Sequence, residues 1–306
     1  MNDLKANHSG TNELLNRRRI VVKNQFLDST NWELVKARKT DIVIASCYKS
    51  GTTLTQQIVN LLINDHDNFE SIHELSLFVD SAIRPPHPAL IESLPDPRFF
   101  KSHLYFEALP YYPNWKYIYL VRDGRDVGLS LHNHLQQNKA WLLETSEKLR
   151  VQMDFGSDNF SEFWDRWVET GEPRWPFWEH INSWWQVRHL PNILLVHYAN
   201  LINDKPREIQ RVADFLNLKL EPSQLEMILE CSTLEYMKEK WKKFEPPRRF
   251  LPKRFLNKGT NGRWQDLLTT QQLRHYESVI SQKLEPECAN WVKNGGSLKL
   301  ENQSMP

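Results

Sequence analysis

Four short runs of apolar residues, rich in β-branched and aromatic side chains, divide the chain. Runs of this length between polar stretches are typical of buried strands. They cover residues 42–45, 98–103, 115–122 and 192–198. Helical patterns alternate with these runs, which predicts one α/β domain with a central parallel sheet flanked by helices on both faces.

Three helices are predicted from the spacing of apolar residues. One follows the first run, a second begins at 123–126 after the third run, and a third covers about 206–216. Four prolines between residues 85 and 95 make the stretch 72–94 loop-like and prevent a long helix there. With no repeat and no dividing linker, we expect a flexible N-terminus (1–18), one domain (19–294) and a flexible C-terminal tail (295–306).

The turn after the first strand has the composition of an anion-binding loop. Lys49 and Ser50 precede Gly51, and Thr52 and Thr53 open the following helix. Such a turn aims backbone N–H groups and a helix N-terminus at an anion, while Gly51 permits close approach and Lys49 adds charge. A phosphate therefore fits this turn. An ordinary capped helix is the alternative, because Ser and Thr are good N-caps.

Polar side chains also follow the other three strands. Lys101 and His103 end the second, Arg122 the third and Tyr198 the fourth. Ligands bind beyond the carboxyl ends of parallel strands, so these side chains are predicted to converge on the turn at Lys49. Each alone has a structural interpretation, but together they favour a nucleotide site. The turn is P-loop-like without being a Walker A motif, since Lys49 precedes Ser-Gly-Thr-Thr.

Composition narrows the class of protein. The net charge is +1 over 306 residues, which gives no argument for nucleic acid or an anionic membrane as partner. Three cysteines suit reduced thiols. The first residues lack the apolar core of a secretory signal, and no apolar run approaches the ~20 residues of a membrane span. We expect a cytoplasmic protein.

The motifs, taken in order, resemble those of the cytosolic-type sulfotransferases. They are KSGTT at 49–53, FKSHL at 100–104, YLVRDGRDVGLS at 119–130, WEHINSWW at 178–185 and NKGTNGRW at 257–264. The resemblance spans about residues 30 to 285, and the Trp-rich insert at 140–185 is closer to bacterial members. It implies transfer of a sulfuryl group from 3′-phosphoadenosine 5′-phosphosulfate (PAPS) to an alcohol, phenol or amine, leaving 3′,5′-adenosine bisphosphate (PAP).

The same resemblance implies roles for individual residues. His103 matches the general base, and Lys101 lies two residues before it. Lys49 matches the lysine that stabilises the leaving group within the 49–53 loop that holds the phosphosulfate. The remaining matches are to cofactor-binding positions: Arg122 and Ser130 for the 3′-phosphate, Tyr198 for the adenine, and Lys258 with Gly259 in a closing loop. Ser130 also restrains the loop lysine in the family pattern.

Three positions depart from that pattern. Leu54 and Leu234 replace aromatics beside the adenine, so we expect the base to lie between aliphatic faces. Asn257 replaces an arginine, which removes one phosphate fork. The dimerisation signature is not matched, so a monomer or weak homodimer is expected.

The acceptor pocket should be lined by aromatic residues that the cofactor does not use. Candidates are Phe78, Tyr105, Phe106, His134 and the Trp-rich insert. Within the insert, helical spacing predicts that one set packs in the core instead: Trp164, Trp167, Phe177 and Trp184. No metal is expected, because no His/Cys cluster has ligand spacing.

Two other functions remain open at this point. A P-loop-type kinase using ATP would need Mg²⁺ and a strand ending in Asp, whereas the strands predicted here end in Cys47, His103, Arg122 and Tyr198. A catalytically inactive nucleotide-binding relative would have no reason to retain the lysines, the histidine and Ser130 together.

Overall fold

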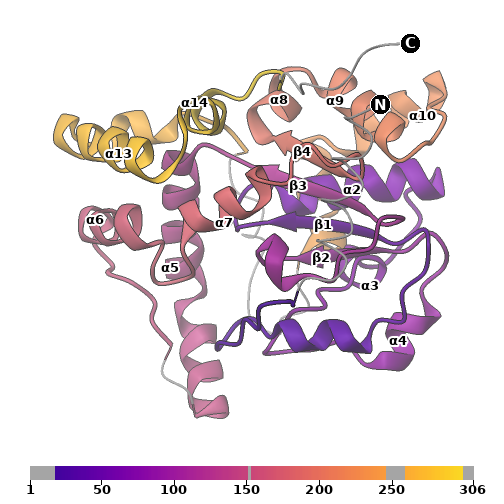
Figure 1. Ribbon diagram of the computed structural model, residues 1–306, viewed down its shortest axis with the longest axis horizontal. Helices are drawn as coiled ribbons and strands as arrows, with labels where there is room; N and C mark the ends of the chain where they lie inside the picture. Colours follow the sequence, from indigo (N-terminus) through magenta and orange to yellow (C-terminus); the bar gives the residue numbers. More distant parts are fainter. Residues whose placement is uncertain (1–17, 151–152, 246–258, 299–306) are drawn as a thin grey trace.

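The computed structural model describes residues 18–150, 153–245 and 259–298. Its centre is a parallel sheet of four strands in the order β2-β1-β3-β4 (Figure 1). The strands are β1 (Ile42–Ser46), β2 (Phe99–Ser102), β3 (Lys116–Val121) and β4 (Ile193–His197). Each coincides with one of the four apolar runs, with β1 extending one residue past its run, which confirms the predicted parallel α/β fold.

Alternate residues of each strand enter two separate cores, one on each face of the sheet. Ile44 pairs with Lys101 on one side and with Ile118 on the other, and this register places side chains of equal orientation side by side. Val43, Ala45 and Tyr119 belong to the larger core. The smaller core contains Ile42, Ile44, Phe99, Ile118 and Leu120. Burial on both faces explains why the strands are apolar throughout.

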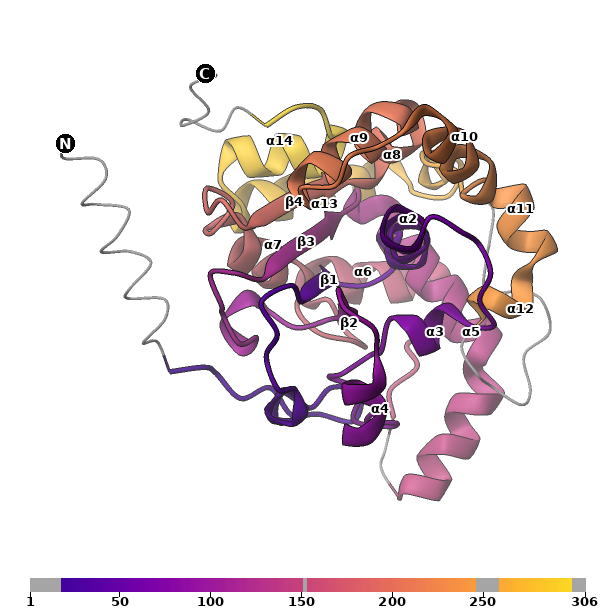
Figure 2. The same cartoon turned by 90° about the vertical axis from the view of Figure 1, so that its right-hand side faces the viewer.

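The smaller core lies under the helices that follow β1 and β4. These are α2 (Thr52–Asn64), α8 (Tyr198–Asn203), α9 (Lys205–Phe215), α10 (Pro222–Cys231), α11 (Leu234–Glu239) and α12 (Trp241–Phe244). Figure 2 shows α2, α9 and α10 together on this side. Prolines in the first turn of α9 and α10 fix where these helices start.

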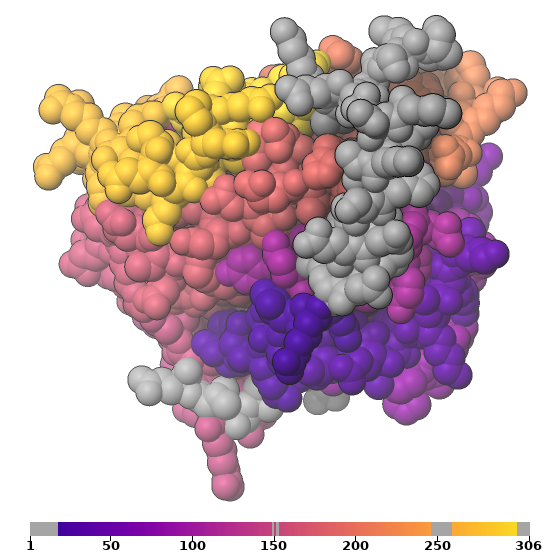
Figure 3. Space-filling model, in the orientation of Figure 1, coloured from indigo at the N-terminus to yellow at the C-terminus, as the bar shows by residue number. Residues whose placement is uncertain are grey.

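The larger core lies under helices from the middle and the end of the chain. They are α5 (Gly124–Leu149), α6 (Phe160–Thr170), α7 (Phe177–Trp185), α13 (Thr270–Lys283) and α14 (Pro286–Asn294). Trp164, Trp167 and Trp184 are fully buried there, and Phe177 nearly so, which confirms that they form core. In Figure 3 the C-terminal end of α5 projects from the body, and α13 and α14 cover one corner.

The stretch expected to be loop-like holds two short helices, α3 (Ile72–Leu75) and α4 (Pro88–Ser93). Ser71 caps the first, and His87 caps the second ahead of Pro88. These caps start helices that the prolines then keep short. Three 3₁₀ turns complete the described elements: η1 (Ser29–Leu34), η2 (Phe106–Ala108) and η3 (Arg263–Asp266). No helix in the described ranges is long and apolar enough to span a bilayer.

Candidate active site

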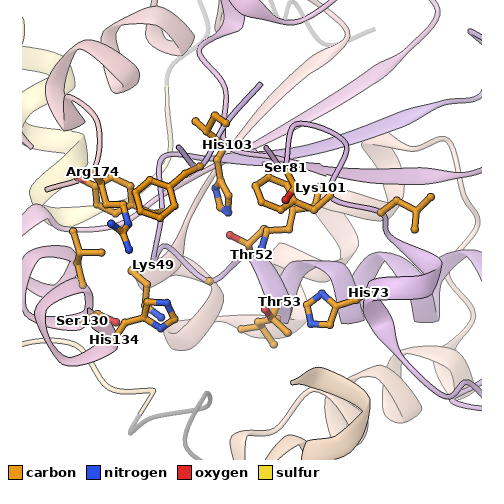
Figure 4. A pocket seen from close by; sticks show the side chains of 18 of the residues that line it. Lys49, Thr52, Thr53, His73, Ser81, Lys101, His103, Ser130, His134 and Arg174 are labelled. Carbon is orange, nitrogen blue, oxygen red and sulfur yellow. The ribbon is translucent and has the colours of Figure 1, made fainter. Parts of the chain in front are cut away.

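A cavity of about 670 Å³ opens at the carboxyl ends of the strands. Its lining combines the turn after β1, the residues after β2 and β3, the start of α8, and residues of the segments between the strands. Lys49, Thr52, Lys101 and His103 are directed into this common space (Figure 4). The predicted convergence of polar residues at this edge of the sheet is therefore confirmed.

The turn after β1 is held in an unusual backbone conformation. Lys49 has φ of 54° and Gly51 has φ of 98°, both in the left-handed region. A Cβ at residue 51 would lie 2.6 Å from Cδ2 of Tyr198, so only glycine fits there. The Ser50 hydroxyl donates to the Tyr48 carbonyl at 3.0 Å and closes the turn from within. The turn leaves the first N–H groups of α2 facing the cavity, where they can bind an anion.

Arg122 is clasped by residues that come much later in the chain. Its Nε donates to Oδ1 of Asn261 at 3.1 Å, and its Nη2 donates to the Thr260 carbonyl at 3.0 Å. The guanidinium lies 4.5 Å from the ring of Tyr198, whose hydroxyl donates to the Gly259 carbonyl at 3.0 Å. An arginine has five N–H donors, so these bonds orient Arg122 and leave donors for an anion.

His103 is fixed through both its backbone and its ring. Its backbone N–H donates to Oδ2 of Asp80 at 2.9 Å, and Nδ1 lies 2.8 Å from the Ser46 carbonyl oxygen. A carbonyl only accepts, so the proton sits on Nδ1 and Nε2 carries a lone pair. Burial lowers the pKa of His103 well below 6.5, and the positive charge of Lys101 lowers it further. The ring is therefore a neutral base at pH 7.

Asp80 belongs to the support of His103 and was missed from the sequence. It is fully buried and also accepts from Nε1 of Trp32 at 3.3 Å. Burial raises the pKa of Asp80 to about 6. Hydrogen bonds to its carboxylate oppose this rise, and the bond from the His103 backbone N–H lowers the pKa more than the others do. Lys101 pairs with Phe78 in an isolated bridge, and its ammonium lies 4.8 Å from that ring.

Part of the cavity wall comes from the Trp-rich insert (residues 140–185), which contacts the turn after β1. The buried hydroxyl of Tyr48 accepts from Nε1 of Trp167 at 3.0 Å and lies 3.3 and 3.4 Å from the carbonyl oxygens of Gly171 and Trp175. Burial raises the pKa of Tyr48 well above its usual value, so the hydroxyl stays protonated and donates to these carbonyls. Trp175 in turn lies 6.0 Å from His103, centroid to centroid. One hydroxyl thus fastens the insert to the residue before Lys49.

Most predicted site residues lie together in this cavity. Those lining it are Lys49, Gly51, Thr52, Thr53, Leu54, Phe78, Lys101, His103, Arg122, Ser130, His134, Tyr198, Leu234 and Gly259. Ser50 stays inside the turn. Asn257 and Lys258 lie outside the described residues. Residues not singled out from the sequence also line it, including Arg84, Arg174 and Lys205.

Tyr105 and Phe106 were expected in the acceptor pocket but do not line the cavity. After His103 the chain turns into η2, which carries both side chains away from the strand ends. Tyr105 packs 4.9 Å from the ring of His180, and Phe106 is buried 5.4 Å from the ring of Trp184. These two aromatic residues stabilise the core instead.

Within the described ranges, no group of three or more His, Cys, Asp or Glu side chains is placed to hold a metal ion. The cationic residues of the cavity, together with the backbone amides of the turn, can neutralise a phosphate or sulfonate directly. Leu54 and Leu234 both line the cavity. The arrangement has the parts needed to bind a multiply anionic nucleotide and to take a proton beside it.

Comparisons with known proteins agree on one family. The family model described as "Sulfotransferase domain" matches residues 39–286. Sulfotransferase 1C2 of Rattus norvegicus is 28% identical over 276 residues, covering 83% of this chain and 87% of that protein. The glycolipid sulfotransferase of Mycobacterium tuberculosis strain H37Ra is 24% identical, covering 90% and 95%.

Solved structures share the fold. Retinol dehydratase in complex with androsterone and PAP superposes with a TM-score of 0.67 at 23% identity, covering 89% of this chain and 91% of that one. Mouse sulfotransferase SULT7A1 complexed with PAP gives a TM-score of 0.67 at 18% identity, covering 90% and 94%.

Proposed function

The chain belongs to the sulfotransferase domain family and is a PAPS-dependent sulfotransferase, and from this premise we propose that His103 is its general base. The acceptor is a small molecule with a hydroxyl or amine group, which loses its proton to Nε2 of His103. One observation carries this proposal: the Ser46 carbonyl holds the proton on Nδ1, so that Nε2 is left as the acceptor.

PAPS supplies the sulfuryl group, whose bond to the phosphate oxygen breaks as a new S–O bond forms to the acceptor. The turn at 49–53 and the N-terminus of α2 hold the phosphosulfate. Lys49 stabilises the negative charge that grows on the departing phosphate oxygen, and Lys101 neutralises the sulfonate oxygens. Arg122 and Ser130 bind the 3′-phosphate. Their half-buried or buried positions in the cavity lining support these roles.

The adenine binds between Leu54 and Leu234 beside Tyr198. All three line the cavity, the Tyr198 ring lies against Arg122, and Leu234 lies beside Gly259, whose carbonyl accepts from the Tyr198 hydroxyl. Aliphatic faces bury the base without aromatic stacking, so phosphate recognition carries more of the affinity. The androsterone bound to the structural relative is an apolar hydroxylated molecule, which fits the aromatic wall formed here by Phe78, Trp141 and Trp175.

The test is transfer from labelled PAPS to a panel of phenols, aliphatic alcohols and amines, with and without EDTA. We expect His103→Ala to lower kcat by about 10²–10⁴-fold while the affinity for PAP is retained. His189→Ala is the matched control, because that histidine is exposed and does not line the cavity. Retention of more than a tenth of the turnover by His103→Ala would refute the base. Loss of transfer in EDTA, or transfer from ATP, would refute the metal-free mechanism.

A further inference from the structure

The charges in the cavity are of one sign. Six Lys and Arg residues line it, and none of its lining residues in the described ranges is Asp or Glu. Four of the cations lie where the donor nucleotide would use them: Lys49, Lys101, Arg122 and Lys205. The last of these donates to the Ser232 carbonyl at 2.8 Å, close to Leu234 on the adenine side. Arg84 and Arg174 are the two cations for which the proposed donor contacts have no use.

Building on the proposed function, we infer that the acceptor carries an anionic group, a carboxylate or another oxyanion, and that Arg174 binds it. Arg174 is half-buried in the wall formed by the Trp-rich insert. Figure 4 shows its guanidinium inside the cavity on the side of Lys49 and His134. Arg84 is exposed at the cavity mouth, where solvent screens its charge, so it contributes less.

The position of Arg174 is built rather than incidental. It lies between Gly171 and Trp175, whose carbonyl oxygens are the two that the buried Tyr48 hydroxyl contacts. Its guanidinium lies 3.9 Å from the ring of Phe26, and its Nη1 lies 3.3 Å from the Pro173 carbonyl oxygen. A guanidinium has five N–H donors in one plane, and when its face lies on an aromatic ring its edge has the geometry that matches the two oxygens of a carboxylate.

Apart from a few neutral polar side chains such as His134 and Gln137, the other lining residues are mainly aromatic and aliphatic, so the predicted acceptor is amphipathic. Phe78, Trp141 and Trp175 are among them, and the Trp175 ring lies next to that of His103. Because Trp175 directly follows Arg174 and its ring lies 6.0 Å from that of His103, the oxyanion and the reacting hydroxyl should be joined by a short apolar spacer. A hydroxylated aromatic or aliphatic acid has this form. Cationic amines are disfavoured by charge repulsion.

The test uses pairs of acceptors that differ only in charge. Hydroxyaryl acids with one to three methylenes before the carboxylate, and ω-hydroxy fatty acids, are each compared with the primary amide of the same length. The full-length enzyme and Arg174→Met are assayed with PAPS, since methionine keeps an apolar stem against Phe26. Arg188→Met is the control: Arg188 also covers an aromatic ring, that of Trp185 at 4.2 Å, but does not line the cavity.

We expect the best acid to exceed its amide in kcat/KM by about 10- to 100-fold, as for one charge-assisted bidentate contact. Arg174→Met should abolish that preference, leave the amide within about threefold and leave PAP affinity unchanged. Arg188→Met should keep the preference. Equal kcat/KM values of the wild type for the acid and its amide would overturn the inference. An equal fall in kcat/KM for both acceptors in Arg174→Met would also overturn it. So would a loss of PAP affinity in Arg174→Met, which would place this arginine in the donor site.

The outcomes for the two proposals can be told apart. If neutral phenols are sulfated and acids are not preferred, the proposal of an anionic acceptor is refuted, whereas the proposed sulfuryl transfer still holds. If no acceptor is sulfated, calorimetric titration of the acids and amides into the enzyme with PAP still decides the matter. Tighter binding of the acids, lost in Arg174→Met, would support the inference, and equal binding would contradict it.

Discussion

Tyr48→Phe removes one hydroxyl at the contact between the turn after β1 and the Trp-rich insert. Nε1 of Trp167 loses its acceptor, and the carbonyl oxygens of Gly171 and Trp175 lose a shared donor. All these groups belong to the buried core or lie against it. A buried donor left without a partner costs about 1–3 kcal/mol, and the carbonyl side adds to it. We therefore expect unfolding free energy to fall by about 2–4 kcal/mol.

The variant should also bind PAP more weakly, by about 3- to 10-fold. Lys49 follows Tyr48 and holds a left-handed backbone, which persists only where its surroundings enforce it. Once Tyr48 is no longer anchored to the insert, the turn samples other conformations and binding must restore the competent one. Denaturant unfolding gives the stability term, and calorimetry with PAP gives the affinity.

Tyr117→Phe is the matched control. The Tyr117 hydroxyl is also buried, accepts from the backbone N–H of Tyr112 at 3.0 Å and donates to the Pro110 carbonyl at 2.8 Å. It does not line the cavity. We expect a similar loss of stability with unchanged PAP affinity. If Tyr48→Phe had the same unfolding free energy as the wild type, the energetic reasoning would be refuted. Equal PAP affinities in the two variants would refute the coupling between the Tyr48 hydroxyl and the conformation of the Lys49 turn.

Two further results are expected. Gly51→Ala should weaken PAP binding by more than tenfold, because its Cβ would lie 2.6 Å from a carbon of the Tyr198 ring in a left-handed backbone; near-normal calorimetric affinity would contradict this. The acid limb of kcat/KM should lie well below pH 6.5, since a lowered pKa keeps His103 unprotonated until the pH falls through that value. If an acid limb near pH 6 disappears in Asp80→Asn, it reports the Asp80 carboxyl, whose pKa is about 6. If an acid limb at pH 6.5 persists in Asp80→Asn, the His103 assignment is refuted.

The strands and their end residues could be predicted because both follow from local pattern. A strand buried on both faces is apolar along its whole length, as Tyr117 to Val121 are, so its end is visible where Arg122 interrupts the run. Parallel strands then bring their carboxyl ends to one edge without further information. The turn at Lys49 and the residues after β2 were found in this way.

The acceptor wall could not be predicted, because it depends on contacts distant in sequence. The Tyr48 hydroxyl holds the segment that carries Arg174 by contacting the carbonyl oxygens of Gly171 and Trp175. These two residues are 123 and 127 positions from Tyr48 in the sequence. Nothing local to Arg174 indicates that contact. Phe106 was misplaced for the opposite reason: an aromatic residue near His103 suggested a pocket, but the 3₁₀ turn directs it into the core. Composition predicts burial, and only the turn geometry decides on which side.

The hydrogen bonds that orient Arg122 can form only late in translation, because their acceptors lie near the C-terminal end of the chain. Arg122 and its partner Asn261 are 139 positions apart, so all four strands emerge before the residues that orient this guanidinium. At about 5–20 residues per second, translation needs about 7–30 s to cross that interval. A nascent chain that ends before residue 259 therefore contains all residues of the four strands and of the Lys49 turn, but lacks the groups that Arg122 and Tyr198 bind. Full nucleotide affinity is acquired only near the end of translation.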